Sequence, residues 1–355
     1  MSRFGNQLKL RHDMKHLHKI AFLPLCAALL LAACDRNRHT PDPEKIPLSF
    51  TASSQTLPVK AGNATDPKPL GCDFGVWGYA TKQGQMDYLI WEESAMSKVT
   101  YNEDSDSYIP DTYAFWFSGY AYNFIAVAPY TDGADRLTCF TIGPNKDALT
   151  FAYDMSDIYA PSAENVVPRP GIDLMGSIAK RPAYKVGEDG VQELVFHRLT
   201  SRIDINVKFD YSTTPVITEV RLENVDANAT YALSYSETGL GIECDIDDKF
   251  TDTTIPLSLT ELGDGLWTVT VYILPQDVSE FELFMDFTNG NDEYSIFPIT
   301  LKFPDGHDTN YGINAWHKWN ITLTNELFVF FDVSVENWDD GGPAGGDDKG
   351  EIPFN

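Results

Sequence analysis

Short runs in which apolar and polar residues alternate recur along most of this chain, and they restrict its fold more than any other feature. In the stretch Leu194–Phe209, apolar side chains occupy every second position from Ile203 to Phe209. This spacing predicts a β-strand with one face in the core and one in water. Further strands are expected at Ile46–Phe50, Phe74–Tyr79, Asn123–Ala128, Val216–Leu222, Trp267–Leu274, Phe281–Phe287, Tyr294–Phe303, Trp316–Leu323 and Leu327–Val335. No helical pattern exceeds about three turns, so the sequence predicts an all-β protein.

Clusters of Gly, Pro, Asn and Asp separate these runs at intervals typical of antiparallel β-sandwiches. The pattern is weakest around residues 184–193, and we place a domain boundary there. This gives an N-terminal β-sandwich domain at residues 61–188 and a C-terminal one at residues 189–338. Residues 339–355 are rich in Gly and Asp and are expected to form a flexible acidic tail.

An apolar run near the N-terminus ends on a cysteine. The run from Ile20 to Leu31 follows basic residues and is shorter than the roughly 20 residues that cross a bilayer. We therefore interpret residues 1–33 as a signal peptide. The ending Leu31-Ala32-Ala33-Cys34 resembles the lipobox of bacterial lipoproteins, which predicts lipidation of Cys34 with acyl chains such as palmitate. An ordinary secretory signal with a chance cysteine is the alternative.

Charge restricts the partners of the chain. After the signal peptide, 21 Lys and Arg stand against 51 Asp and Glu, a net charge of about −30. Such a surface repels nucleic acid and anionic lipid, and no basic stripe is available for phosphate contacts. An aromatic content of 13% is too high for a disordered chain. We therefore expect a packed, strand-rich protein that binds no nucleic acid.

No catalytic constellation stands out. The chain lacks HExxH and GxSxG patterns and a Gly-rich phosphate loop. His197 and His317 are candidate bases, but histidines in such positions are more often packed core or turn residues. Because no acid and base stand at a recognisable spacing, we expect no enzymatic activity, no cofactor and no metal site.

Acidic and aromatic clusters each have two interpretations. Glu103–Asp106, Asp245–Asp248 and Asp339–Asp340 could bind calcium, but none has the pattern of an EF-hand loop, which favours solvated turns. Six aromatic residues look exposed and could stack on sugar rings, although filling a sandwich core is the commoner use. They are Trp77, Tyr79, Trp91, Trp116, Tyr120 and Tyr122.

Three cysteines remain after the signal peptide: Cys72, Cys139 and Cys244. Their long spacings fit neither a zinc site nor a redox CxxC motif. The odd number favours buried free thiols, and a disulfide between two of them is the alternative.

Eight short stretches follow one another in an order that covers nearly the whole chain after the signal peptide. They are Leu31–Cys34, Phe74–Tyr79, Tyr113–Trp116 with Tyr122–Pro129, Asp173–Met175, Leu194–Leu199, Ile273–Gln276, Trp316–Lys318 and Val335–Trp338. Each is weak alone. Together they resemble the fimbrillin family, the FimA-like and Mfa-like subunits that build type V pili on Gram-negative bacteria.

The resemblance implies two transthyretin-like antiparallel β-sandwich domains and a surface-exposed lipoprotein of the outer membrane that polymerises with other fimbrial subunits. In the family, a maturation protease cuts after a basic residue in the loop that follows the first strand. A strand from a neighbouring subunit then fills the groove that is left. On this chain residues 34–60 would contain the tether and the removable strand, Ile46–Phe50.

The expected protease site departs from the family pattern, because Lys60 stands where the family usually has arginine. Either a Lys-tolerant protease cuts this protein, or it stays uncut as an anchor at the base of the fibre. Stalk, tip and anchor roles all remain open.

The candidate donor strand is Leu327–Val335. Its apolar face consists of Leu327, Val329, Phe331, Val333 and Val335. The same segment could equally be the last strand of the second domain. The alternative function is a monomeric surface lipoprotein that captures a host or other glycan through the aromatic residues near Trp91 and Trp116.

Overall fold

The computed structural model describes residues 45–337 except for 55–69, 84–87, 92–95, 131–135, 144–145, 160–170, 186, 211–214, 237–238, 247–252, 291 and 325–328. The described strands lie in the compact unit Pro47–Asn355. A single-turn helix, α3 (Ser156–Tyr159), accompanies them. The predicted all-β class is confirmed.

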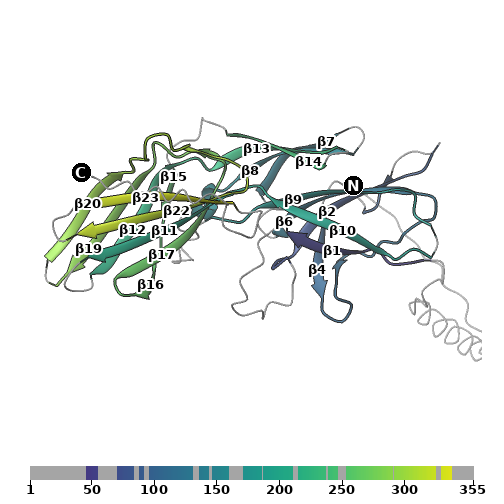
Figure 1. The fold of residues 1–355 in the computed structure, drawn as a ribbon. Helices are drawn as coiled ribbons and strands as arrows, with labels where there is room; N and C mark the ends of the chain where they lie inside the picture. Colours follow the sequence, from purple (N-terminus) through teal and green to yellow (C-terminus); the bar gives the residue numbers. More distant parts are fainter. Residues whose placement is uncertain are drawn as a thin grey trace, which may run out of the picture. The chain divides into compact units, whose positions relative to one another are not determined.

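Seven strands close into a small barrel (Figure 1). They follow one another as β2-β4-β5-β1-β10-β9-β6, and the ring closes because β2 also pairs with β6. The short strand β3 (Tyr88–Leu89) is attached to β2 outside the ring. The barrel strands are β1 (Ser49–Ser54), β2 (Phe74–Thr81), β4 (Ser97–Asn102), β5 (Ser107–Pro110), β6 (Ala121–Ala128), β9 (Met175–Arg181) and β10 (Val191–Arg198).

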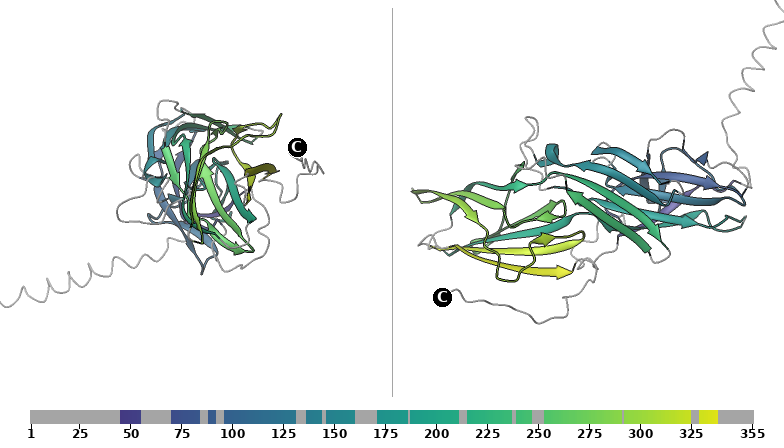
Figure 2. Two further views of the ribbon diagram at one scale, coloured as in Figure 1. Left: turned by 90° about the vertical axis from the view of Figure 1, so that its left-hand side faces the viewer. Right: turned by 90° about the horizontal axis from the view of Figure 1, so that it is seen from above.

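The remaining strands form four further sheets (Figures 1 and 2). A five-stranded sheet contains β16 (Thr260–Gly263), β17 (Leu266–Ile273), β11 (Ser201–Asp210), β22 (Ala315–Thr324) and β23 (Val329–Asn337). One four-stranded sheet contains β15 (Thr253–Pro256), β12 (Val216–Val225), β19 (Glu282–Asn289) and β20 (Asp292–Thr300). The other contains β14 (Gly239–Ile246), β13 (Asn228–Ser236), β8 (Ala148–Asp154) and β7 (Leu137–Ile142). A small pair joins β18 (Gln276–Asp277) to β21 (Asn310–Tyr311).

Aromatic rings fill the barrel interior. The ring of Phe50 lies 6.0 Å from Phe74 and 5.3 Å from Phe124, measured between centroids, and Phe74 lies 5.1 Å from Phe196. All four side chains are fully buried. A barrel this small is filled by side chains rather than hollow, so each strand contributes inward residues that its neighbours require.

The predicted strand Leu194–Phe209 is two strands in different sheets. Residues up to Arg198 belong to β10 in the barrel, whereas β11 begins at Ser201 in the five-stranded sheet. The buried apolar positions are even-numbered before the break, at Leu194 and Phe196, and odd-numbered in β11, from Ile203 to Phe209. This change of phase marks a break, because a continuous strand keeps its apolar side chains on alternate positions.

The first strand is also displaced from its predicted position. The sequence predicted Ile46–Phe50, whereas β1 spans Ser49–Ser54 and Pro47 forms an isolated bridge with Phe115. The polar residues after Phe50 predict that the strand ends there. Ala52 nevertheless faces the core, while Thr51 and Ser53 face outward. Alanine is a weak strand former, so Ala52 gives only a faint signal that the strand continues.

Two sheets combine strands from both sides of the predicted division at residue 189. Strand β10 lies in the barrel beside β9 and β1, and β13 pairs with β8 over seven positions. The division into domains at residues 61–188 and 189–338 stays a prediction.

Replacing Phe50 with alanine tests the importance of β1 for the barrel. Because Phe50 is fully buried and packs against the rings of Phe74 and Phe124, we expect Phe50→Ala to lower the free energy of unfolding by about 3–5 kcal/mol. Thr51→Ala on the same strand is the control, with an expected change within about 0.5 kcal/mol. Chemical denaturation followed by tryptophan fluorescence measures both. Similar small losses in the two variants would contradict a core role for Phe50.

Candidate functional site

The structure places β1 in a slot between two barrel strands. It pairs in parallel with β10 over six positions, from Ser49 opposite Val191 to Ser54 opposite Phe196. On its other side Phe50 pairs with Tyr108 of β5. The backbone N–H of Leu48 also donates a hydrogen bond to the carbonyl of Ala114, at 2.8 Å. Both edges of the strand are therefore in use.

Side chains of β1 and the residue before it alternate between the barrel interior and the surface. Leu48, Phe50 and Ala52 are only 2%, 0% and 4% exposed. Full burial of a leucine or phenylalanine side chain contributes about 1.5–3 kcal/mol. The slot thus accepts a large apolar residue, an aromatic residue and a small residue at alternate positions.

The expected lipidation site, Cys34, and the expected protease site, Lys60, both lie outside the described residues. Lys60 falls in the segment 55–69 between β1 and β2, so the predicted cut would separate β1 from the rest of the barrel. Among the described residues no helix is long and apolar enough to cross a membrane.

The candidate donor segment contains β23, the last strand of the five-stranded sheet. It pairs with β22 in antiparallel fashion over nine positions, from Leu323 opposite Val329 to Ala315 opposite Asn337. Phe331 is buried and its ring lies 5.4 Å from that of Phe303. Val333 is half-buried and Val335 is 54% exposed, whereas Leu327 lies outside the described residues.

The expectation that six aromatic residues are exposed is wrong for four of them. Trp77, Trp91, Trp116 and Tyr122 are buried, and Tyr79 and Tyr120 are partly buried. The indole N–H of Trp91 donates to the carbonyl of Thr112, at 2.9 Å. Inward-facing rings cannot stack on a sugar, so the surface predicted for glycan capture near Trp91 and Trp116 is instead barrel core. The large exposed aromatic residues nearby are Tyr113 and Phe117.

The histidines are packed rather than poised for catalysis. His197 lies in β10 opposite Gly176. His317 is 5% exposed and stacks face to face on Tyr311, with ring centroids 3.4 Å apart. Burial, with a smaller contribution from nearby His307, lowers the pKa of His317 to about 4. A neutral imidazole in an aromatic cluster suits a structural role.

The acidic clusters give no metal site among the described residues. Glu103–Asp106 forms an exposed turn between β4 and β5, in which the hydroxyl of Tyr101 donates to Asp106 at 2.6 Å. Asp245 lies in β14, whereas Asp247, Asp248, Asp339 and Asp340 fall outside the described residues.

The three cysteines form no disulfide, as predicted, but the expectation that they are buried is wrong for all three. Cys139 is exposed in β7, while Cys72 and Cys244 are partly buried. Burial raises the pKa of Cys244 to about 12, which keeps this thiol protonated and unreactive at neutral pH.

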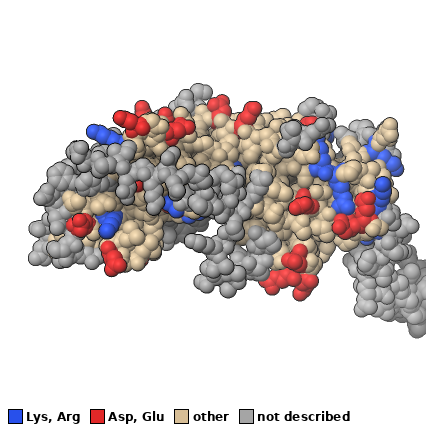
Figure 3. Space-filling model, in the orientation of Figure 1, with Lys and Arg blue, Asp and Glu red and all other residues tan. Residues whose placement is uncertain are grey.

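Charge on the face in Figure 3 is mixed, with acidic side chains in several places and basic ones among them. The described residues of this face carry no continuous basic stripe. Backbone-phosphate binding would require such a stripe.

The comparison with protein families decides the identity. The sequence pattern of one family, described as Fimbrillin-like, matches residues 70–338. The chain belongs to the fimbrillin-like family. The match begins after β1, so the strand that fills the slot precedes the matched region.

Several solved structures are similar to this fimbrillin-like protein. A candidate cell adhesion protein of Bacteroides uniformis is 18% identical, with 83% of this chain and 99% of that chain covered and a TM-score of 0.48. A fimbrial protein of Bacteroides vulgatus is 16% identical, with 82% and 99% covered and a TM-score of 0.44. The tip fimbrial protein Mfa3 of Porphyromonas gingivalis is 11% identical, with 83% and 100% covered and a TM-score of 0.41. No curated protein matches the chain.

Acid should destabilise this fimbrillin-like protein through His317. Its pKa is about 4 in the folded state and 6.5 without burial, so the unfolded state binds more protons between these values. Stability due to neutral His317 is therefore present above pH 6.5 and is lost as the pH falls towards 4. The loss amounts to about 3 kcal/mol.

The variant His317→Phe keeps a ring against Tyr311 but removes the titration. Urea denaturation from pH 8 to pH 4.5 should therefore give a flatter dependence of unfolding free energy on pH in this variant. His307→Phe is the comparison, and a smaller effect is expected because His307 is less buried. Equal slopes in wild type and His317→Phe would contradict the assignment.

Proposed function

We propose that this protein is a subunit of a cell-surface fimbria that is assembled by strand donation. One observation carries the proposal: β1, near the start of the described chain, completes a barrel formed otherwise by strands from residue 74 onward. A strand that is first in sequence and pairs on both sides can be removed by one cut. The rest of the barrel remains covalently continuous.

Loss of β1 would leave a costly gap. Six positions of β10 would lose their parallel partner, and unpaired backbone N–H and C=O groups at a sheet edge are a template for another strand. The rings of Phe74 and Phe124 would lose their contact with Phe50. A strand from a neighbouring subunit would restore both the hydrogen bonds and the apolar contacts, which is the physics of β-augmentation.

The C-terminal strand has a side-chain pattern similar to that of the segment in the slot. Val329-x-Phe331-x-Val333 repeats the order of Leu48-x-Phe50-x-Ala52, with an aromatic residue in the middle and apolar residues two places away. Strand β23 also ends the five-stranded sheet, where β22 is its partner. These features support β23 as the donor, with Leu327, Val329, Phe331, Val333 and Val335 as the donated face.

The remaining expectations form one scheme with this mechanism. Lipidation of Cys34 would tether the exported chain to the outer membrane, and a protease that accepts Lys60 would release β1. An uncut copy would remain tethered and serve as the anchor of the fibre. The protein would act without enzymatic activity, and two transthyretin-like sandwich domains remain the proposed finer description of the fold.

Changing Lys60 tests the proposed cut. In cells that assemble the fimbria, the mature wild-type protein should lack residues 34–60, and intact-mass measurement reads this directly. Lys60→Ala should retain them, because the protease loses its basic residue. Lys68→Ala lies in the same segment between β1 and β2 and serves as the control, with normal processing expected. Removal of residues 34–60 in Lys60→Ala would refute the assigned site.

The same strains test assembly. Strand-donated polymers should give SDS-resistant ladders in the wild type and in Lys68→Ala, with loss of the ladder in Lys60→Ala. An intact, lipidated wild-type monomer that binds sugar and forms no ladder would instead support the glycan-binding alternative.

A further inference from the structure

The start of the β1 slot has two walls that come from distant parts of the chain. On the β5 side, the carbonyl of Ala114 accepts from the N–H of Leu48. On the β10 side, the carbonyl of Gly190 accepts from the N–H of Ser49, at 3.1 Å, and from its hydroxyl, at 3.2 Å. The Gly190 carbonyl is thus the first acceptor of the parallel ladder.

Trp116 connects these two walls. Its backbone follows Ala114 by two residues, and its indole N–H donates to the Gly190 carbonyl at 2.8 Å. The side chain is 1% exposed. The buried side chain of Trp116 therefore links the two walls. It extends from the segment on the β5 side and binds the acceptor on the β10 side.

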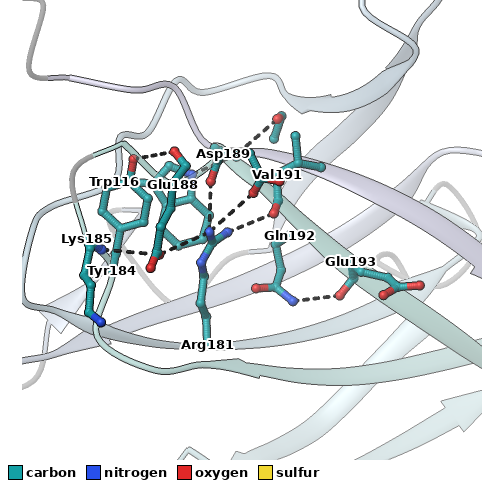
Figure 4. Close-up of polar contacts among 11 residues, drawn as sticks. Trp116, Arg181, Tyr184, Lys185, Glu188, Asp189, Val191, Gln192 and Glu193 are labelled. Atoms are coloured by element: carbon teal, nitrogen blue, oxygen red, sulfur yellow. Dashed lines mark hydrogen bonds and ion pairs between the residues drawn. The ribbon is translucent and has the colours of Figure 1, made fainter.

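Arg181 holds the indole and the β9–β10 connection together (Figure 4). Its guanidinium lies over the ring of Trp116, 4.5 Å from the ring centroid. The ring of Trp116 also stacks on that of Tyr184. It donates to the carbonyls of Val191 and Asp189, at 2.8 and 2.9 Å. Its side chain is 15% exposed and forms ion pairs with Glu188 and Asp189. Partly buried charge-assisted hydrogen bonds of this kind are among the stronger ones.

These contacts are made without β1. Arg181 belongs to β9, and Trp116 lies in the segment after β5. Gly190 is the residue that precedes β10. The contacts would therefore remain when β1 leaves the slot.

Alternation alone cannot set the register of a strand in this slot. A shift of one residue would turn the apolar face outward, but a shift of two residues keeps it inward. Such a shift would place Ala52 in the site of Phe50, with a cavity as the result. A first acceptor that Trp116 holds in place gives the hydrogen-bonded ladder a defined start.

We infer that Trp116 is a positioning residue, which together with Arg181 sets the register and spacing of the strand that fills the slot. For β1 the inference stands on the contacts above. Its extension to a strand from a second subunit rests on the proposed function.

Register can be measured in the full chain by disulfide formation, with the other cysteines replaced by alanine. Thr51→Cys with Glu193→Cys reports the native register, because these residues are opposite each other and both are exposed. Thr51→Cys with Val191→Cys, or with Val195→Cys, reports shifts of two residues. Each pair is oxidised under the same conditions and the cross-linked fraction is compared.

Trp116→Phe keeps an aromatic ring but removes the indole donor. The ratio of native to shifted cross-links should fall about fivefold to tenfold, as expected for the loss of one hydrogen bond. Arg181→Lys, a milder change, should lower the ratio in the same direction. Trp319→Phe is the matched control. Trp319 lies in β22 of the five-stranded sheet, and the substitution removes its buried indole N–H, which donates to the hydroxyl of Tyr311. It should lower stability without changing the ratio.

Each outcome bears on the inference. An unchanged ratio in Trp116→Phe would overturn it, and so would an equal fall in Trp319→Phe. Hydrogen exchange adds a second measurement: amides of β1 and β10 should exchange about tenfold faster in Trp116→Phe, but not in Trp319→Phe. Because these measurements concern β1 in its own chain, they can succeed even if strand donation between subunits fails its own test.

Discussion

The parallel pairing of β1 with β10 is the interaction on which the rest of the barrel depends. It joins the first described strand to one more than 130 residues later, and it closes a ring whose other strands follow from residue 74. A barrel has no free edge only while every strand is present. A single cut after β1 would separate this strand from the rest of the chain. The barrel would then have free edges until another strand took its place.

Closure alone would accept any strand with alternating apolar residues, so specificity needs a second element. The carbonyl of Gly190 gives the ladder a defined start, because Trp116 and Arg181 hold that acceptor in place through contacts that do not involve β1. The interior adds a size restriction, since Phe50 contacts Phe74 and Phe124 while Ala52 occupies a smaller space. Backbone pairing thus supplies attraction, and the fixed acceptor and the core supply selectivity.

Several aromatic side chains and His317 are buried and make structural contacts inside the protein. Trp91 and Trp116 direct their indole N–H groups to backbone carbonyls inside the protein, and His317 stacks on Tyr311 in a neutral form. These residues stabilise connections between strands. The large aromatic residues that are exposed in this region are Tyr113 and Phe117.

The sequence by itself determined the strand class and the family, because alternation and short motifs are local properties that the chain carries at each position. It located strands such as β2, β6 and β22 close to their true bounds. Only the tertiary structure decided that Leu194–Phe209 divides between two sheets and that Thr51–Ser54 continue β1. It also decided that Trp116 meets Gly190. Such pairings join residues far apart in sequence, and no local pattern records which distant backbone group a side chain will reach.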